Sequence, residues 1–262
     1  MQENPQRCPY CGGSLDPRYY FCAHCGSSYR QADDRIFRPV PPSPPSLERK
    51  IVILARPGIT LFTLLACTII AFSILGLLLF GEERLDLVFY FESGALVTLT
   101  AIFALRHQSD IASLFTRMGI ANRYFAMGIP LMATILWINF SYHEFLIHAL
   151  GIDEATSITA LFREAGVSPT GIIALVCLEP AIFEEIAFRG LLQEYLSRCV
   201  GEWKTCFGVA FLFMLLHFSV LSMPYLFLVG FFLCWIRNKT QSIYPSMIFH
   251  FLHNFGVVAA GG

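Results

Sequence analysis

The segment TGIIALVCLEPAIFEEIAFRG, residues 170–190, decides the fold because it joins a long apolar run to a cluster of ionisable side chains. Its first half is apolar enough to lie in lipid, whereas its second half carries Glu184, Glu185 and Arg189. Each ionisable group within a membrane span costs at least about 2.5 kcal/mol, so such groups face a protein interior or a wet cavity and mark functional sites. The segment therefore predicts a membrane helix that carries a polar site.

The composition of the whole chain also indicates a membrane protein. Hydrophobic residues make up 55% of the 262 residues and charged residues only 14%, whereas about a quarter of the residues of a soluble domain are charged. The net charge of -1 and the scattered basic residues exclude a nucleic-acid partner. The N-terminus lacks the pattern of a cleaved signal peptide, so we expect it to stay in the cytoplasm.

Seven apolar stretches are candidates for crossing a hydrocarbon layer of about 30 Å. We expect these membrane spans at residues 59–80, 85–105, 124–145, 170–195, 203–218, 225–236 and 243–260. Lys and Arg should be enriched in the cytoplasmic loops. Alternate loops hold most of these residues, namely Arg49, Lys50, Arg56, Arg106, Arg117, Arg123, Arg198, Lys204, Arg237 and Lys239, whereas the opposite loops hold Arg84 and Arg163. The fold class is therefore an all-α polytopic membrane protein of about seven transmembrane helices, with the N-terminus in the cytoplasm and the C-terminus outside.

One further segment, residues 110–120, has an apolar helical face but is too short to span the bilayer. We expect it to lie in the membrane interface.

Two Cys-x2-Cys knuckles open the chain, and each is followed directly by a glycine. Four thiolates at this spacing can close a tetrahedral zinc site, with the glycines supplying tight turns. The ligands would be Cys8, Cys11, Cys22 and Cys25. Two disulfides are the alternative, but these need an oxidising compartment, for which the sequence has no export signal. Residues 1–30 are therefore predicted to be a structural Zn²⁺ ribbon, which we expect to contact a cytoplasmic protein partner.

The ribbon is followed by a proline-rich stretch, residues 31–50, in which five prolines favour an extended, semi-rigid linker. The transmembrane domain then occupies residues 51–262.

The charges of the fourth span fall into two groups. Glu185 and Arg189 are four residues apart, which places them on one helix face as an ion pair. Glu184 lies about 100° around the helix and has no such partner. An unpaired carboxylate shielded from water suits a general base.

Later spans carry His217, His250, His253 and Asn254. Counted at about 1.5 Å per residue from the cytoplasmic ends, Glu184, His217, His250 and Asn254 lie about 14 to 21 Å deep. We therefore expect one site near the middle of the bilayer, entered from the cytoplasm.

Three motifs together resemble the CPBP intramembrane proteases, also called the CAAX protease and bacteriocin-processing family or Abi family. They are PAIFEEIAFRG at residues 180–190, Phe213 with His217, and His250 with Asn254. The resemblance covers residues 170–260, the expected catalytic core. It implies a membrane-embedded cavity that hydrolyses peptide bonds of a membrane-associated protein or peptide. Glu184 and His217 would activate water, His250 and Asn254 would hold the oxyanion, and Glu185 and Arg189 would shape the site.

Two alternatives remain open at this stage. His217, His250 and a glutamate could bind a catalytic zinc ion at the same site. Alternatively, the chain could be a membrane scaffold or receptor whose buried charges only stabilise the helix bundle. A transporter would usually show an inverted repeat, and the sequence has none.

Overall fold

The computed structural model describes residues 7–8, 10–15, 22–27, 47–150 and 158–260. The chain divides into two compact units, Met1–Lys50 and Ile51–Gly262. The described part of the first unit consists of two tight turns, one isolated β-bridge between Arg7 and Ser14, and four helical residues at its end. The described part of the second unit is built from helices, which confirms the all-α fold class. Most of the predicted linker lies outside the described residues, but its last four residues belong to the first helix, α1.

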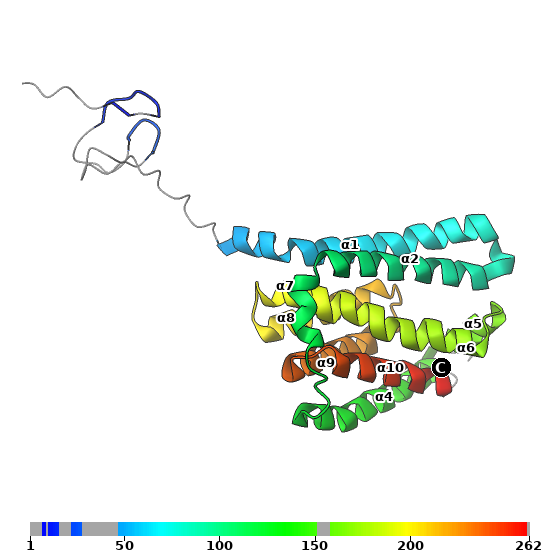
Figure 1. Cartoon of the computed structure of the whole chain (residues 1–262). Helices are drawn as coiled ribbons and strands as arrows, with labels where there is room; N and C mark the ends of the chain where they lie inside the picture. Colours follow the sequence, from blue (N-terminus) through cyan, green and yellow to red (C-terminus); the bar gives the residue numbers. More distant parts are fainter. Residues whose placement is uncertain (1–6, 9, 16–21, 28–46, 151–157, 261–262) are drawn as a thin grey trace, which may run out of the picture. The chain divides into compact units, whose positions relative to one another are not determined.

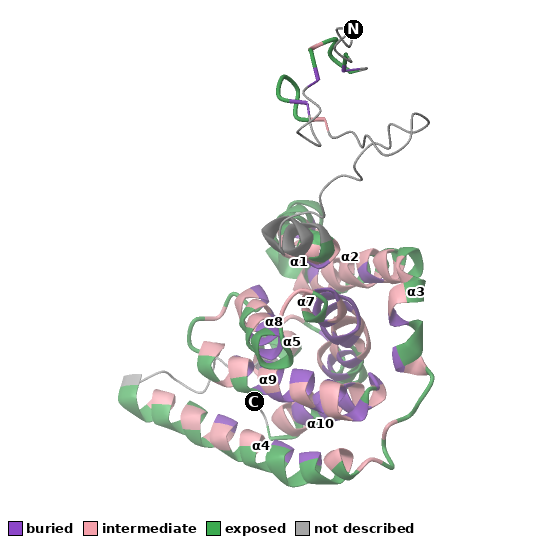
Figure 2. Ribbon diagram, turned by 90° about the vertical axis from the view of Figure 1, so that its left-hand side faces the viewer, coloured by how far each residue is buried: buried purple, intermediate pink, exposed green. Residues whose placement is uncertain are grey.

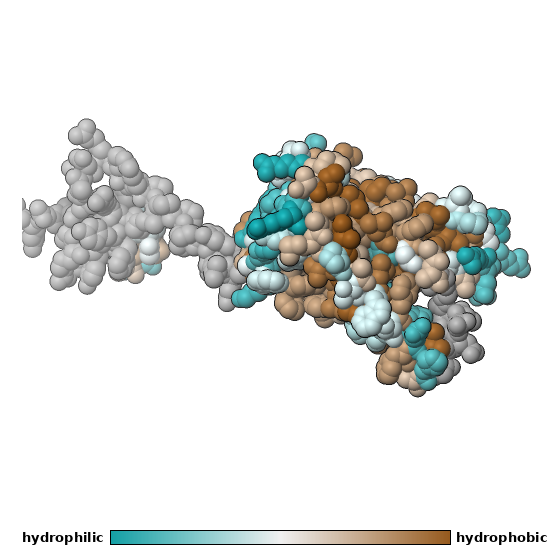
Figure 3. Space-filling view, turned by 90° about the horizontal axis from the view of Figure 1, so that it is seen from below, coloured by the Kyte–Doolittle hydropathy of each residue, from teal (hydrophilic) through white to brown (hydrophobic). Residues whose placement is uncertain are grey.

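Three long helices form the outer part of the second unit. They are α1 (Leu47–Phe80), α2 (Leu85–Arg106) and α4 (Arg123–Leu150), with the short helix η1 (Glu82–Arg84) between α1 and α2. Within the described residues, the segments Leu54–Phe80, Glu82–Arg106 and Arg123–Ala149 are long and apolar enough to cross a membrane. Large apolar side chains on these helices, such as Leu78, Leu105 and Trp137, are exposed. Figure 3 shows an apolar band between hydrophilic ends, as expected of a membrane protein.

The segment after α2 turns back onto the helix bundle. It forms α3 (Gln108–Ile111) and η2 (Ala112–Phe115). Ile111 and Leu114 are buried in one apolar cluster with Phe188 and Leu191 of the central helix. The apolar face predicted for residues 110–120 therefore packs against protein.

A nearly continuous helix runs through the middle of the second unit. The short helix α5 (Ile158–Glu164) precedes it, and it begins with α6 (Pro169–Ile172), where the Ser168 hydroxyl accepts a hydrogen bond from the Gly171 amide at 3.1 Å. Three π-helical segments follow, η4 (Ile173–Leu178), η5 (Pro180–Glu184) and η6 (Ile186–Leu192), and α7 (Gln193–Ser197) ends the run. Pro180 has no N–H group, and the break between η4 and η5 falls next to it. Beside Pro180 the central helix therefore changes its hydrogen-bond pattern but continues.

The last three helices surround this central helix. They are α8 (Glu202–Leu216), α9 (Met223–Thr240) and α10 (Tyr244–Ala259). α8 and α4 both pack along α9, and α10 packs against η4 and η5. The order of these elements can be followed in Figure 1, and Figure 2 shows that buried residues gather on the inner helices whereas α4 is largely exposed.

Helices occupy all seven positions predicted for spans, but the count of seven membrane crossings is not confirmed. α8 and α10 have 15 and 16 residues, which corresponds to only about 22 to 24 Å. The central helix is long enough but carries several charges. Helices packed against other helices can be shorter and more polar than a span surrounded by lipid, because protein groups satisfy their polar atoms.

Candidate active site

The predicted ion pair of the central helix is present and completely buried. Nη1 of Arg189 lies 2.8 Å from Oε1 of Glu185, and neither side chain is exposed to solvent. Arg189 also donates a hydrogen bond to the carbonyl oxygen of Gly230 in α9 at 3.2 Å. Its guanidinium carbon lies 4.5 Å from the ring centre of Phe213 in α8, a cation–π distance. Arg189 therefore ties the central helix to α8 and α9.

His250 of α10 lies between the two adjacent glutamates. Its Nδ1 is 2.9 Å from Oε1 of Glu185, and its Nε2 is 4.0 Å from Oε2 of Glu184. An ionised carboxylate only accepts hydrogen bonds, so Nδ1 carries a hydrogen atom and donates it to Glu185. Glu185 thus binds both Arg189 and His250, whereas the sequence predicted only its contact with Arg189.

Glu184 is free to act on another molecule. Its side chain is 32% exposed, and its Oε2 has no hydrogen-bond partner within the described residues. The 4.0 Å gap to His250 is too long for a hydrogen bond and is a length that a bridging water molecule can fill. Glu184 therefore has the unpaired carboxylate oxygen that a general base requires.

His217 and Glu184 line the same cavity, which has a volume of about 90 Å³. Apolar residues of α1 and α2, including Leu65, Ile69 and Leu96, form the opposite wall. Since liquid water occupies about 30 Å³ per molecule, the cavity has room for a few water molecules. The cavity therefore brings a carboxylate and an imidazole to the same small volume of solvent.

His217 follows the last residue of α8, so it stands at a helix end and not within a span. Its Nδ1 lies 2.8 Å from the carbonyl oxygen of Phe213. A carbonyl oxygen only accepts, so Nδ1 carries the hydrogen and Nε2 of the neutral ring has a free lone pair. This tautomer can accept a proton at Nε2.

Asn254 lies one turn along α10 from His250 but does not line the cavity. Its Nδ2 donates to the carbonyl oxygen of Val176 in η4 at 2.8 Å, and its Oδ1 lies 2.9 Å from Nδ1 of His253. The expected oxyanion donor is thus engaged with the central helix. The structure brings Glu184, Glu185, Arg189 and His250 into direct proximity, places His217 on the shared cavity, and leaves Asn254 beside them.

The sequence analysis missed Glu179, which lines the cavity together with Glu184 and His217. Its Oε2 accepts a hydrogen bond from the hydroxyl group of Ser93 in α2 at 2.8 Å. Glu179 and Glu184 are five residues apart, and the i to i+5 hydrogen bonding of a π-helix brings such residues close to one face. In an α-helix the same two residues would lie on different faces. Glu179 could therefore be found from the sequence only if the π-helical hydrogen bonding were known.

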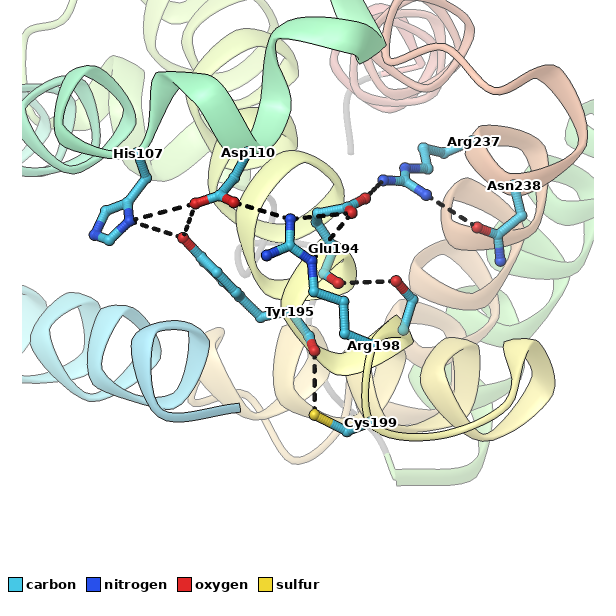
Figure 4. Close-up of polar contacts among 9 residues, drawn as sticks. His107, Asp110, Glu194, Tyr195, Arg198, Cys199, Arg237 and Asn238 are labelled. Atoms are coloured by element: carbon cyan, nitrogen blue, oxygen red, sulfur yellow. Dashed lines mark hydrogen bonds and ion pairs between the residues drawn. The ribbon is translucent and has the colours of Figure 1, made fainter. Parts of the chain in front are cut away.

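A polar network holds the far end of the central helix, as Figure 4 shows. Glu194 accepts a hydrogen bond from Arg237 of α9 at 2.6 Å. Asp110 of α3 accepts hydrogen bonds from the Tyr195 hydroxyl at 2.8 Å and from Arg198 at 2.9 Å. The Tyr195 hydroxyl group and the Arg198 guanidinium lower the pKa of Asp110 below its ordinary value. The network fixes α7 between α3 and α9.

The four cysteines of the two knuckles converge as predicted. Their sulfur atoms lie within 4.8 Å of one another, and this is the one group of at least three potential ligands found in the part of the chain that the structure describes. The Sγ atoms of Cys8 and Cys25 are 3.6 Å apart, and those of Cys11 and Cys22 are 3.7 Å apart. Gly12 and Gly26 have φ angles of 72° and 71°, the left-handed conformation that favours glycine. The set can hold a metal ion.

Comparison with known families now supports the motif assignment. Residues 166–256 match the family model described as type II CAAX prenyl endopeptidase Rce1-like. No curated protein and no solved structure matches the chain. The matched segment contains every residue of the three motifs. The chain therefore carries an Rce1-like domain, which confirms the resemblance to the CPBP intramembrane proteases.

Proposed function

Because residues 166–256 form an Rce1-like domain, we propose that the chain is an intramembrane endopeptidase that uses Glu184 and His217 to activate water. The single observation that carries this proposal is the cavity shared by both residues, each with a free proton-accepting atom. A water molecule between them would lose its proton to Glu184 as its oxygen attacks the peptide carbonyl carbon. The substrate is a membrane-associated protein or peptide.

His250 is the first candidate for stabilising the resulting oxyanion. Its Nδ1–H is held by Glu185, which fixes the orientation of the ring. With a hydrogen on both ring nitrogens, the ring would donate to the oxyanion from Nε2. Nε2 faces Glu184 and therefore the reacting water. Asn254 would act as the second donor. It would use its other amide hydrogen, or its Nδ2 would give up the hydrogen bond to the Val176 carbonyl oxygen and donate to the oxyanion.

Hydrolysis by a zinc ion at the same site is the alternative mechanism. The metal-free mechanism is favoured because His217, His250 and the glutamates do not form a group of converging ligand atoms among the described residues. The test is zinc analysis of the chain after Cys8, Cys11, Cys22 and Cys25 are changed to serine. We expect cleavage to persist without stoichiometric zinc, whereas one zinc ion per active chain would support the alternative.

The cysteine cluster is proposed to be a structural zinc ribbon. Four thiolates at about 2.3 Å from a tetrahedral zinc ion lie about 3.8 Å apart, and the observed separations of 3.6 and 3.7 Å are close to this. The ribbon would lie in the cytoplasm and dock a protein partner there, since the loops on that side carry most of the Lys and Arg residues.

The central experiment uses the protein reconstituted in lipid vesicles with a quenched fluorogenic peptide. The wild-type protein should cleave the peptide, and the Glu184→Gln variant should retain less than about a hundredth of that rate. Equal cleavage by both would exclude the proposed base. A protein that cleaves no peptide yet retains partner binding through the ribbon would favour the scaffold alternative.

A further inference from the structure

The central helix presents three glutamates near the cavity, and each has a different partner. Glu185 binds Arg189 and His250. Glu184 faces the imidazole of His250 at 4.0 Å. Glu179 has a neutral partner, the Ser93 hydroxyl, at 2.8 Å. The described structure places no Lys or Arg side chain within ion-pair distance of Glu179, so it is the acid with the least charge compensation.

Glu179 and Glu184 share one small cavity. Both line the volume of about 90 Å³, together with His217. Two carboxylates that line one small cavity disfavour each other's ionisation, and such pairs commonly hold one proton between them. Because Glu184 is the proposed base, Glu179 is the carboxyl group of this pair that would carry the proton.

We propose that Glu179 is a further catalytic residue, the general acid that protonates the leaving amine. This inference rests on the proposed function of Glu184 as the base. The two residues would then act on opposite sides of one reaction, with Glu184 receiving a proton while Glu179 gives one.

The proton inventory of this reaction is balanced. One proton of water passes to Glu184 as the water oxygen bonds to the carbonyl carbon. The carbon–nitrogen bond then breaks, its electron pair stays on nitrogen, and that nitrogen takes the proton of Glu179. The products are a carboxylic acid and an amine. The proton on Glu184 returns to Glu179 through cavity water, which restores the starting state.

Ser93 is the positioning residue of this arrangement. Its hydroxyl donates to Oε2 of Glu179 and reaches the central helix from α2. This contact leaves the other carboxyl oxygen, Oε1, available to carry the proton.

The test compares two substrates that differ only in their leaving group. One is a fluorogenic peptide, and the other is the same peptide with sulfur in place of the scissile nitrogen. An amine must be protonated to leave, whereas a thiolate leaves unprotonated. Glu179→Gln should lower the rate on the peptide by at least about 100-fold and on the thioester by less than tenfold. Glu184→Gln should lower both rates strongly, because attack by water precedes both departures.

A matched control is Glu92→Gln. Glu92 of α2 also accepts a hydrogen bond from a serine, Ser73 of α1, at 2.7 Å, but it is not among the cavity-lining residues. This variant should cleave both substrates at the wild-type rate. Ser93→Ala, which keeps the acid and removes its positioning hydroxyl, should slow cleavage of the peptide alone.

Equal losses of Glu179→Gln on the two substrates, or wild-type cleavage of the peptide, would overturn the inference. If Glu179→Gln does not fold, Ser93→Ala provides the test instead. Equal losses of this variant on the peptide and the thioester would then contradict the role of Glu179 as general acid. A wild-type rate for Glu184→Gln would instead contradict the proposed function of Glu184 as base, and the inference about Glu179 would fail with it. The two negative results can therefore be told apart.

Discussion

Nδ1 of His250 lies 2.9 Å from Oε1 of Glu185, within a buried chain of contacts that continues to Arg189. The sequence analysis assigned Glu185 only to shaping the site. In the structure Glu185 holds His250, which was assigned to stabilising the oxyanion. An arrangement of this kind, in which a carboxylate accepts a hydrogen bond from an imidazole, fixes the tautomer and the orientation of the ring. Stability and activity of this site thus depend on the same side chain.

The first prediction is that substitutions of the two adjacent glutamates, Glu184 and Glu185, have different effects on the stability of the protein. Glu185→Gln leaves the buried Arg189 without its carboxylate, so unfolding should become easier by about 3 to 5 kcal/mol. Activity should fall as well, because His250 loses its partner. Glu184→Gln removes an unpaired acid, so the melting temperature should stay the same or rise slightly while cleavage falls at least about 100-fold.

Melting temperature and peptide cleavage measured on both variants decide the matter. A destabilised, active Glu184→Gln beside a stable, inactive Glu185→Gln would reverse the assigned roles. Equal losses of both properties in both variants would mean that the two acids act as one coupled unit.

The second prediction concerns His217. This residue stands at the end of α8 with its Nδ1 bonded to its own helix, so His217→Gln should change the melting temperature little. Cleavage should nevertheless fall at least about 100-fold, because His217 lines the cavity and its Nε2 is the proposed proton-accepting atom. His143→Gln, an exposed histidine of α4 outside the cavity, is the matched control and should cleave normally. Retained activity of His217→Gln would leave Glu184 as the only base.

The sequence was sufficient to predict the membrane character, the positions of the helices and the ion pair of Glu185 and Arg189. Hydrophobic length and the spacing of charges are local properties, so they can be read without a structure. The contact of His250 with Glu185 could not be predicted. The depth of a residue in the membrane does not determine how its helix is rotated about its own axis, and so does not determine which neighbour the side chain contacts. Glu179 was missed for a different reason, since the sequence analysis assumed α-helical periodicity where the helix is π-helical.

The length of the later helices was also beyond the sequence analysis. The apolar run 203–218 was expected to be one span, but α8 ends at Leu216. Phe218 then adopts a φ angle of 49°, a left-handed conformation that is unusual for a bulky residue and ends the helix. His217 thereby reaches the cavity from a helix end, where its backbone direction differs from that in a continuous helix.

The third prediction tests the proposed topology. A cysteine introduced at position 43 should react with a membrane-impermeant label only from the cytoplasmic side, and one at position 261 only from the opposite side. The four ribbon cysteines, which would all become reactive once the ribbon is disrupted, and the exposed thiol of Cys67 are first replaced by serine. Labelling of both positions from the same side would mean an even number of membrane crossings.

The fourth prediction concerns acid stability through Asp110. The Tyr195 hydroxyl and Arg198 lower the pKa of this carboxyl group in the folded protein. Its contribution to stability is therefore complete above the ordinary aspartate pKa of about 3.9 and is lost as the pH falls through the lower folded value. Asp110→Asn should reduce the melting temperature at neutral pH and flatten its decline in acid.

The matched control for this effect is Asp86→Asn. Asp86 pairs with Arg84, two residues away at the turn between α1 and α2, whereas Asp110 connects α3 to α7. The melting temperature of Asp86→Asn should therefore fall less at neutral pH. An equal fall in the two variants would show that the network around α7 adds nothing beyond a surface contact.

The last prediction is that the two knuckles fold only around a metal ion. The described part of this unit buries just Cys8, Leu15 and Cys22, and a segment of about thirty residues cannot bury enough apolar surface to fold alone. Structural zinc supplies about 10 to 16 kcal/mol in comparable peptides at neutral pH, which is as large as the whole stability of a typical small domain. Chelation should therefore unfold the ribbon and leave the membrane helices intact.

Cys8→Ser should abolish zinc binding, whereas Cys67→Ser, which changes an exposed cysteine of α1, should not. A peptide of residues 1–30 that gave the same dispersed NMR spectrum with and without zinc would contradict the metal-dependent fold, because four reduced thiols supply no other cross-link between the knuckles.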